Sequence, residues 1–510
     1  MSVLAAKAAI ITDAASASGE TVNLSLISHT NAGKTTLVRT LLGRDVGEVR
    51  DAAHVTAVAS GYVMLQHEGD TLMLWDTPGF GDTARLLGRL KLSGNPLGWL
   101  LSQVWDRWRE RPLWSSQQAV RNARDQADVV LYLVNASEDP ADAGYVPLEL
   151  EVLAWIGKPV VLLLNQMGPP RDDAAAEEER WRSHLSAHAV VQGALTLDAF
   201  ARCWVQEGTL LRVVAALLPE PKQTTCRTLA GVWQVKKLER FHASMAVLAG
   251  ELAAIVTDRE TLETQGWRDK VGGVLRDLQK GDRPEARRAM QALAKRLDAR
   301  VRTSTEQLIQ AHGLSGRAVR DVLTRARSDY ATSAPVETSL AAVFGGLVSG
   351  AAGGLAADLA AGGLTLGGGM LVGGLLGAVA AGGAARGYNY VKGDQDPAVR
   401  WSDVVFRSMV GDALLRYLAV AHYGRGRGDY EESEHPALWR TAVMELTERR
   451  AADIRALWER GRSADAPALA QPLDALLTSC SAELLSRFYP DARDLFGRAL
   501  AVAPPTSSDH

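Results

Sequence analysis

The chain has 510 residues and a formal net charge of −3, so it has no general electrostatic attraction for nucleic acid, and we expect no nucleic-acid partner. Its three cysteines, Cys203, Cys226 and Cys480, are far apart and odd in number, which excludes a disulfide framework and a zinc-binding spacing. They fit a reducing cytoplasm. Residues 4–12 are mildly apolar but have no basic stretch before them, so they do not match a secretion signal.

A phosphate-binding loop is predicted at residues 28–35, between an apolar run and a stretch with helical spacing. Backbone N–H groups and a helix N-terminus in such a loop point at phosphate oxygens. We expect Lys34 to be an exposed ligand of the β- and γ-phosphates and Thr35 to hold Mg²⁺. Ser28 stands where the motif has glycine, so its backbone must suit a residue with a Cβ. The predicted nucleotide contacts in this stretch are His29, Thr30, Asn31, Ala32, Gly33, Lys34, Thr35 and Thr36.

A second group of nucleotide contacts is predicted farther along the chain. Thr56 lies in a polar loop, where a threonine can close over Mg²⁺ and the γ-phosphate. Two strands with hairpin spacing follow, at residues 62–65 and 72–75, and the second ends in Asp76-Thr77-Pro78-Gly79. Asp76 can hold the Mg²⁺ shell, and the Gly79 amide can bond the γ-phosphate. The predicted metal ligands are therefore Thr35, Thr56 and Asp76.

This order of motifs resembles Era/TrmE-type GTPases of the translation-factor class. Asn31 occupies a loop position where several such GTPases use asparagine to hold a potassium ion, so the resemblance implies K⁺ beside GTP and Mg²⁺. Phe80 stands where many signalling GTPases have a water-positioning glutamine, and a phenyl ring cannot orient water by hydrogen bonding. Hydrolysis must draw its help from elsewhere, and no catalytic residue is identified.

Nearly continuous apolar strands are predicted at residues 129–134 and 160–164, as in a buried parallel sheet. The second ends in Asn165, which the resemblance makes a nucleotide contact. Gly168 occupies the place of the aspartate that reads guanine in this family, so discrimination between guanine and adenine is in question. Asp172 or Asp173 could substitute only with a different spacing.

Residues 232–333 turn to a helical period. Their apolar seams are Leu238, Phe241, Met245, Leu248, Leu252 and Ile255, then Met290, Leu293, Leu297, Val301 and Leu308, up to a helix stop at Gly313. Such seams form an intramolecular bundle or, alternatively, a coiled-coil dimer. A later helix is outlined by Trp439, Val443, Leu446, Ile454 and Trp458.

Between Glu337 and Arg386 the only charged residue is Asp358. The two uncharged stretches, 338–357 and 359–385, are each about as long as a membrane span. Glycines recur every fourth position, as in closely packed membrane helices. We expect a glycine-zipper hairpin that is covered either by lipid or by the bundle of the same chain, with the protein cytoplasmic and associated with the inner membrane.

The whole chain resembles a bacterial family in which an Era-type GTPase domain precedes an uncharacterised helical domain. The matching stretches are residues 31–35, 198–204, 363–367 and 415–422. The predicted fold is an α/β P-loop GTPase with a mostly parallel sheet and flanking helices, followed by a mostly α-helical region with the glycine-zipper hairpin. The expected boundaries are 1–20 for an extension, 21–220 for the GTPase domain, 225–335 for a helical bundle, 336–393 for the hairpin and 394–510 for a C-terminal helical domain.

Two functions are consistent with the sequence. One is Mg²⁺-dependent GTP binding with slow hydrolysis, coupled to a membrane-associated helical domain. The other is a non-hydrolysing, nucleotide-gated scaffold that binds a protein partner. Expected partners are GTP, membrane lipid through residues 338–385, and a protein partner or a second copy of the chain.

Overall fold

A computed structural model describes residues 19–30, 32–44, 46, 59–81, 83–91, 98, 111–166, 174–185, 187–199, 203–261, 284–314, 388–392, 397–423 and 437–496. The chain forms two compact units. Unit 1 contains residues 1–238 and 422–430, and unit 2 contains residues 239–421 and 431–510. The division falls within one long helix, α8 (Lys222–Val256).

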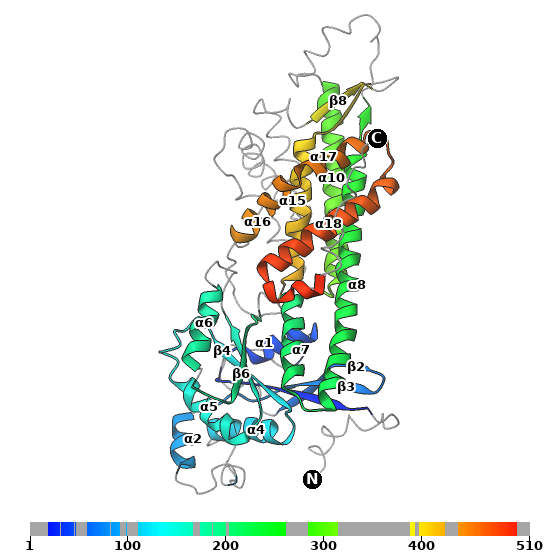
Figure 1. The fold of residues 1–510 in the computed structure, drawn as a ribbon. Helices are drawn as coiled ribbons and strands as arrows, with labels where there is room; N and C mark the ends of the chain where they lie inside the picture. Colours follow the sequence, from blue (N-terminus) through cyan, green and yellow to red (C-terminus); the bar gives the residue numbers. More distant parts are fainter. Residues whose placement is uncertain are drawn as a thin grey trace, which may run out of the picture. The chain divides into compact units, whose positions relative to one another are not determined.

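Unit 1 is built on a six-stranded sheet in the order β2-β3-β1-β4-β5-β6, with helices around it (Figure 1). Only β2 and β3 pair antiparallel, as the predicted hairpin, and the other neighbours pair parallel. The predicted mostly parallel α/β fold is thus confirmed. The strands are β1 (Thr21–Ser28), β2 (Ser60–His67), β3 (Asp70–Asp76), β4 (Val129–Asn135), β5 (Val160–Asn165) and β6 (Val191–Thr196).

The helices of unit 1 cover both faces of the sheet because alternate side chains of a strand point to opposite faces. On one face a core joins Ile27, Tyr132 and Leu162 to apolar side chains of α2, α4, α5 and α6. On the other, α7 packs so closely on β6 that a Cβ at Gly193 would lie 3.2 Å from Val213 Cγ1. These helices are α1 (Lys34–Leu42), α2 (Thr83–Leu90), α4 (Arg111–Asp125), α5 (Tyr145–Ile156), α6 (Ala174–Leu185) and α7 (Trp204–Leu217).

In the part that the structure describes, unit 2 is mostly helical, as predicted, and contains a small sheet in the order β7-β9-β8. The strands of this sheet are β7 (Glu260–Thr261), β8 (Tyr388–Lys392) and β9 (Pro397–Trp401). Its helices, after the second part of α8, are α10 (Pro284–Ala311), α15 (Asp403–Ala421), α16 (Ala437–Arg449), α17 (Ala451–Arg460), α18 (Ala466–Phe488) and the 3₁₀ helix η3 (Pro490–Phe496).

The core of unit 2 contains a buried ion pair that joins three helices. Arg416 of α15 donates to both carboxylate oxygens of Glu251 in α8, at 2.7 and 2.8 Å. The same guanidinium donates to Ser304 Oγ and Thr305 Oγ1 of α10, at 2.8 and 3.1 Å. Buried charges need such pairing and hydrogen bonding, and this cluster supplies both to Arg416 and Glu251.

The predicted apolar seam on α8 lies inside the chain, since its members from Phe241 to Ile255 are buried. This arrangement favours the intramolecular bundle over the coiled-coil dimer. The prediction of a single helix from Trp439 to Trp458 is wrong. The structure has two helices, α16 and α17, separated at Arg450, whose φ of −93° and ψ of 10° are not helical.

All three cysteines are buried free thiols. Burial raises the pKa of Cys226 to about 11 and that of Cys480 to about 12. The uncharged stretches at 338–385 lie outside the described residues, and so does the predicted glycine-zipper hairpin. None of the described helices has the length and apolar character of a membrane span.

Candidate nucleotide-binding site

The candidate site lies where β1 and β3 end side by side. The two strands are parallel, with Leu26 opposite Asp76, so the loop after β1 meets the carboxyl end of β3. Ligands of open α/β sheets bind at this edge. The loop passes into α1 through Gly33, whose φ of 89° favours glycine.

Thr35 and Asp76 form the candidate metal site. Thr35 Oγ1 donates to Asp76 Oδ2 at 2.7 Å, and Asp76 is 2% exposed. A hydroxyl and a carboxylate oxygen are the hard donors that Mg²⁺ prefers, so these two residues fit the ion. Thr56, the third predicted ligand, lies outside the described residues.

Lys34 is only 8% exposed, so the expectation of an exposed lysine is wrong. Its ammonium group donates to Ser28 Oγ at 2.9 Å. Burial lowers the pKa of Lys34, while the negative charges of Asp76 and Glu149 oppose that lowering. The serine at the first motif position therefore holds the lysine side chain through its hydroxyl group.

The segment after β3 lies directly against the phosphate loop. A Cβ on Gly79 would lie 3.0 Å from Lys34 Nζ and 3.1 Å from Thr30 Cα, so this close approach favours glycine. The next residue bonds the loop through its backbone: Phe80 N donates to Ser28 O at 2.9 Å, and Phe80 O accepts from Thr30 N at 3.2 Å. Thr30 Oγ1 donates to the same carbonyl at 2.6 Å.

The Phe80 ring is fully buried in the core of unit 1, together with Leu86 and Leu87 of α2. The ring therefore attaches the segment after Gly79 to the apolar core of unit 1. A buried phenyl ring contributes apolar contacts, and the polar atoms that Phe80 presents to the loop belong to its backbone.

Asn165 links the phosphate loop to the segment that follows β6. Its Nδ2 donates to Ala32 O at 2.8 Å, and its Oδ1 accepts from Ala199 N at 2.8 Å. The side chain is fully buried. A Cβ on Gly33 would lie 2.8 Å from Asn165 Nδ2, which leaves room only for glycine at the loop's end. Gly168, Asp172 and Asp173 lie outside the described residues.

Most of the predicted nucleotide contacts lie at this edge of the sheet or, like Asn165, are hydrogen-bonded to the loop there. They are His29, Thr30, Ala32, Gly33, Lys34, Thr35, Thr36, Asp76, Gly79 and Asn165. Asn31, the predicted potassium ligand, lies outside the described residues, as does Thr56.

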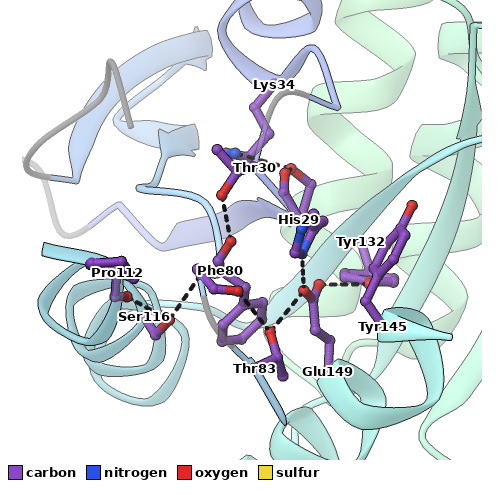
Figure 2. Close-up of polar contacts among 12 residues, drawn as sticks. His29, Thr30, Lys34, Phe80, Thr83, Pro112, Ser116, Tyr132, Tyr145 and Glu149 are labelled. Carbon is purple, nitrogen blue, oxygen red and sulfur yellow. Dashed lines mark hydrogen bonds and ion pairs between the residues drawn. The ribbon is translucent and has the colours of Figure 1, made fainter. Parts of the chain in front are cut away.

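A polar network behind the loop was not predicted (Figure 2). It centres on Glu149 of α5, which contacts His29 of the loop, Tyr132 of β4 and Thr83 of α2. These residues are up to 120 positions apart, so no local spacing reveals them. The sequence offers one indication of this network, namely that Glu149 is a charged residue in the otherwise apolar stretch from Val146 to Leu150.

Comparison with known families places the chain. Residues 183–475, more than half of its length, match the family described as a domain of unknown function, DUF3482. The chain belongs to the DUF3482 family. In this DUF3482 protein, residues 23–166 match the family described as 50S ribosome-binding GTPase (MMR_HSR1). The part that carries the site is thus an Era-like GTP-binding domain of the P-loop GTPase type, as predicted.

GTPase Era of Heliobacterium modesticaldum is similar to this DUF3482 protein, with 26% identity over 156 residues. The match covers 31% of this chain and 41% of that relative, so the chain spans less than half of the relative's length.

Solved structures of Era are also similar. One, in complex with MgGDPNP and part of 16S ribosomal RNA, has 18% identity and a TM-score of 0.29, over 40% of this chain and 58% of that chain. Another, an Era variant of Aquifex aeolicus bound to GDP and AlF4⁻, has 18% identity and a TM-score of 0.28, over 39% of this chain and 58% of that chain.

Proposed function

We propose that this protein binds GTP with Mg²⁺ and hydrolyses it slowly. The observation that supports this most is the contact between Thr35 Oγ1 and Asp76 Oδ2 at 2.7 Å, beside the ammonium group of Lys34. Thr35 and Asp76 would hold Mg²⁺, and Lys34 would bond the β- and γ-phosphates. The bound ion would neutralise charge on the phosphate oxygens.

The proposed hydrolysis is slow because of Phe80. Its ring is fully buried, so it neither orients a water molecule nor donates to a phosphate. Hydrolysis then depends on backbone groups and the metal. The rival function, a nucleotide-gated scaffold without hydrolysis, follows from the same residue.

Phosphate release by the purified protein separates the two functions. Wild type should release phosphate from GTP in the presence of Mg²⁺, and Lys34→Ala should release none above background. Because Lys34 is buried, the folding of Lys34→Ala must be checked by circular dichroism and denaturant unfolding. Lys34→Met, which keeps most of the side-chain volume, is the matched second variant. Tight GTP binding by wild type without phosphate release would favour the scaffold.

Potassium is part of the proposal through Asn31. If this side chain helps to seat K⁺ beside the phosphates, GTP hydrolysis is faster in potassium than in sodium salts. Asn31→Ala should then remove the difference. Equal rates for wild type in the two salts would contradict the potassium site.

The membrane-associated role is proposed from the sequence of residues 338–385 alone, since Asp358 is the only charged residue in this segment. The full-length protein should sediment with membranes and resist extraction by salt. A variant that lacks residues 338–385 should stay in the supernatant and still bind nucleotide. Full-length protein that is entirely free of the membrane fraction would contradict this role.

A further inference from the structure

Glu149 is a fully buried carboxylate that accepts hydrogen bonds from three different parts of unit 1. Its Oε1 lies 2.6 Å from His29 Nδ1 and accepts from Thr83 Oγ1 at 3.1 Å. Its Oε2 accepts from the Tyr132 hydroxyl at 2.7 Å. Figure 2 shows the three groups converging on the carboxylate from the loop, from α2 and from β4.

The environment of Glu149 makes these contacts costly to lose. A carboxylate without water around it is unfavourable unless it is hydrogen-bonded and paired with a positive charge. A carboxylate oxygen is a hydrogen-bond acceptor, so the His29 Nδ1–H group is the donor in the 2.6 Å contact. The His29 ring further packs on Tyr145, with ring centroids 4.4 Å apart. Two side chains of α5 therefore hold this loop residue.

Two of the three donors belong to segments that face the candidate phosphate site. His29 lies between Ser28 and Thr30 in the loop, while Thr83 begins α2, four residues after Gly79. The Thr83 hydroxyl also lies 3.2 Å from the carbonyl oxygen of Gly81. Glu149 thus ties the loop to the Gly79 segment by a route separate from the backbone bonds of Phe80.

We propose that Glu149 is a positioning residue that makes the site selective for a nucleoside triphosphate over a diphosphate. By holding His29 and Thr83 together, it fixes the distance between Lys34 and Gly79 before the ligand arrives. This inference rests on the proposed function, because it concerns the same nucleotide site.

The selectivity follows because only the γ-phosphate contacts both the phosphate loop and the Gly79 segment. A γ-phosphate that bonds both Lys34 and the Gly79 amide needs the two groups at a fixed separation, and a preformed separation avoids the entropy cost of ordering them on binding. A diphosphate has no γ-phosphate to bridge them. Loosening the Gly79 segment should therefore weaken triphosphate binding and leave diphosphate binding nearly unchanged.

Thr83 offers the cleanest variant, since the proposal gives it no contact with nucleotide. Thr83→Val keeps the shape of the side chain and removes the hydroxyl, whereas Thr83→Ser keeps the hydroxyl. Tyr132→Phe is the matched control because it removes one hydrogen bond from the same carboxylate but leaves the link between loop and α2. Glu149→Gln tests the carboxylate itself.

Affinities for GDPNP and GDP are measured with Mg²⁺ by calorimetric titration of the full-length chain. Thr83→Val and Glu149→Gln should weaken GDPNP binding roughly 5-fold or more, a typical lower value for coupling between sites. Their GDP affinity should stay within about 2-fold of wild type, below the roughly 5-fold change typical of coupling between sites, because GDP has no γ-phosphate to contact Gly79. Thr83→Ser should restore the wild-type ratio, and Tyr132→Phe should keep that ratio even if it lowers stability.

Two results would overturn the inference. One is an unchanged ratio of GDPNP to GDP affinity in a folded Thr83→Val protein. The other is an equal loss in Tyr132→Phe, because the effect would then come from general loosening of unit 1. In both cases wild-type binding of GDPNP would leave the proposed function standing. Wild-type protein that binds neither nucleotide would overturn the proposed function as well.

Discussion

Asn165 Nδ2 donates a 2.8 Å hydrogen bond to the carbonyl oxygen of Ala32, which lies 133 residues earlier in the chain. The same buried side chain accepts from the N–H group of Ala199. One amide group thus fastens the phosphate loop to the segment that follows β6. In this protein the asparagine at the end of β5 stabilises the site through the backbone of the loop.

We expect Asn165→Ala to destabilise unit 1 and to weaken GTP binding at least tenfold. It leaves the Ala32 carbonyl and the Ala199 N–H group without this partner, at a cost of about 1–3 kcal/mol for each buried group. Asn135→Ala is the matched control, because Asn135 pairs with Asn165 across β4 and β5 but is partly exposed. Denaturant unfolding and nucleotide titration check both effects. Equal effects of the two substitutions would contradict the conclusion that the Asn165 side chain stabilises the phosphate loop.

Gly33→Ala should be much more harmful than Gly43→Ala. Both glycines flank α1 with a positive φ, of 89° and 64°, so each alanine brings backbone strain of about 1–2 kcal/mol. Only at Gly33 would the new Cβ lie 2.8 Å from Asn165 Nδ2, whereas nothing lies within 4 Å of it at Gly43. Gly33→Ala should therefore abolish GTP binding, while Gly43→Ala keeps it. Comparable GTP affinities in the two variants would show that the contact with Asn165 is unimportant.

Phe80→Ala should lower the free energy of unfolding by about 3–5 kcal/mol, as for other fully buried phenyl rings. Phe80→Leu, which keeps the site apolar, should lower it by less, about 1 kcal/mol. Phe80→Gln should not speed GTP hydrolysis, because its amide would enter the position of a buried ring. Urea denaturation and phosphate-release rates test these expectations. Faster hydrolysis by a folded Phe80→Gln protein would show that the side chain at this position can reach the nucleotide.

Asp412 of α15 should make the stability of unit 2 depend on pH. Burial raises the pKa of Asp412 to about 7; Arg416 opposes the rise and Glu251 adds to it. Because the folded-state pKa lies above the unfolded value of 3.8, the folded protein keeps this proton between about pH 4 and 7 while the unfolded chain loses it. The contribution to stability is therefore greatest at low pH, falls as pH rises through this window and levels off above about pH 7.

Asp412→Asn removes this ionisation and keeps the size of the side chain. We expect its stability relative to wild type to rise by about 2–3 kcal/mol between pH 5 and 8. Chemical denaturation across this range measures the slope, which does not depend on any fixed cost of the substitution. Parallel pH profiles for the two proteins would contradict the assignment.

The chemistry of the loop could be predicted from sequence because it depends on local order. Lys34, Thr35 and Asp76 follow a strand or begin a helix, and parallel strands bring such ends together. The burial of Lys34 could not be predicted, since it depends on how Gly79 and Ser28 fold over its ammonium group. The contact between His29 and Glu149 could not be predicted either, because it depends on the packing of α5 against β1 and β4.

The helical region was predictable to a lesser extent. Buried positions on α8 and α10 repeat at intervals of three and four, so their apolar seams are visible in the sequence. The break between α16 and α17 has no such signal, because Arg450 is neither glycine nor proline. The bonds from Arg416 to Glu251 and Ser304 connect residues more than a hundred positions apart and depend on tertiary packing alone.

The burial of Cys203, Cys226 and Cys480 makes the protein suitable for site-specific labelling. Thiols react with maleimides as thiolates, and the raised pKa values of Cys226 and Cys480 keep these two protonated at neutral pH. Probes should therefore attach to introduced cysteines without removal of the native ones. Val235 in unit 1 and Met444 in unit 2 are 56% and 51% exposed, so Val235→Cys and Met444→Cys provide an attachment point in each unit. Fluorescence transfer between two such dyes would show whether GTP alters the separation of the units.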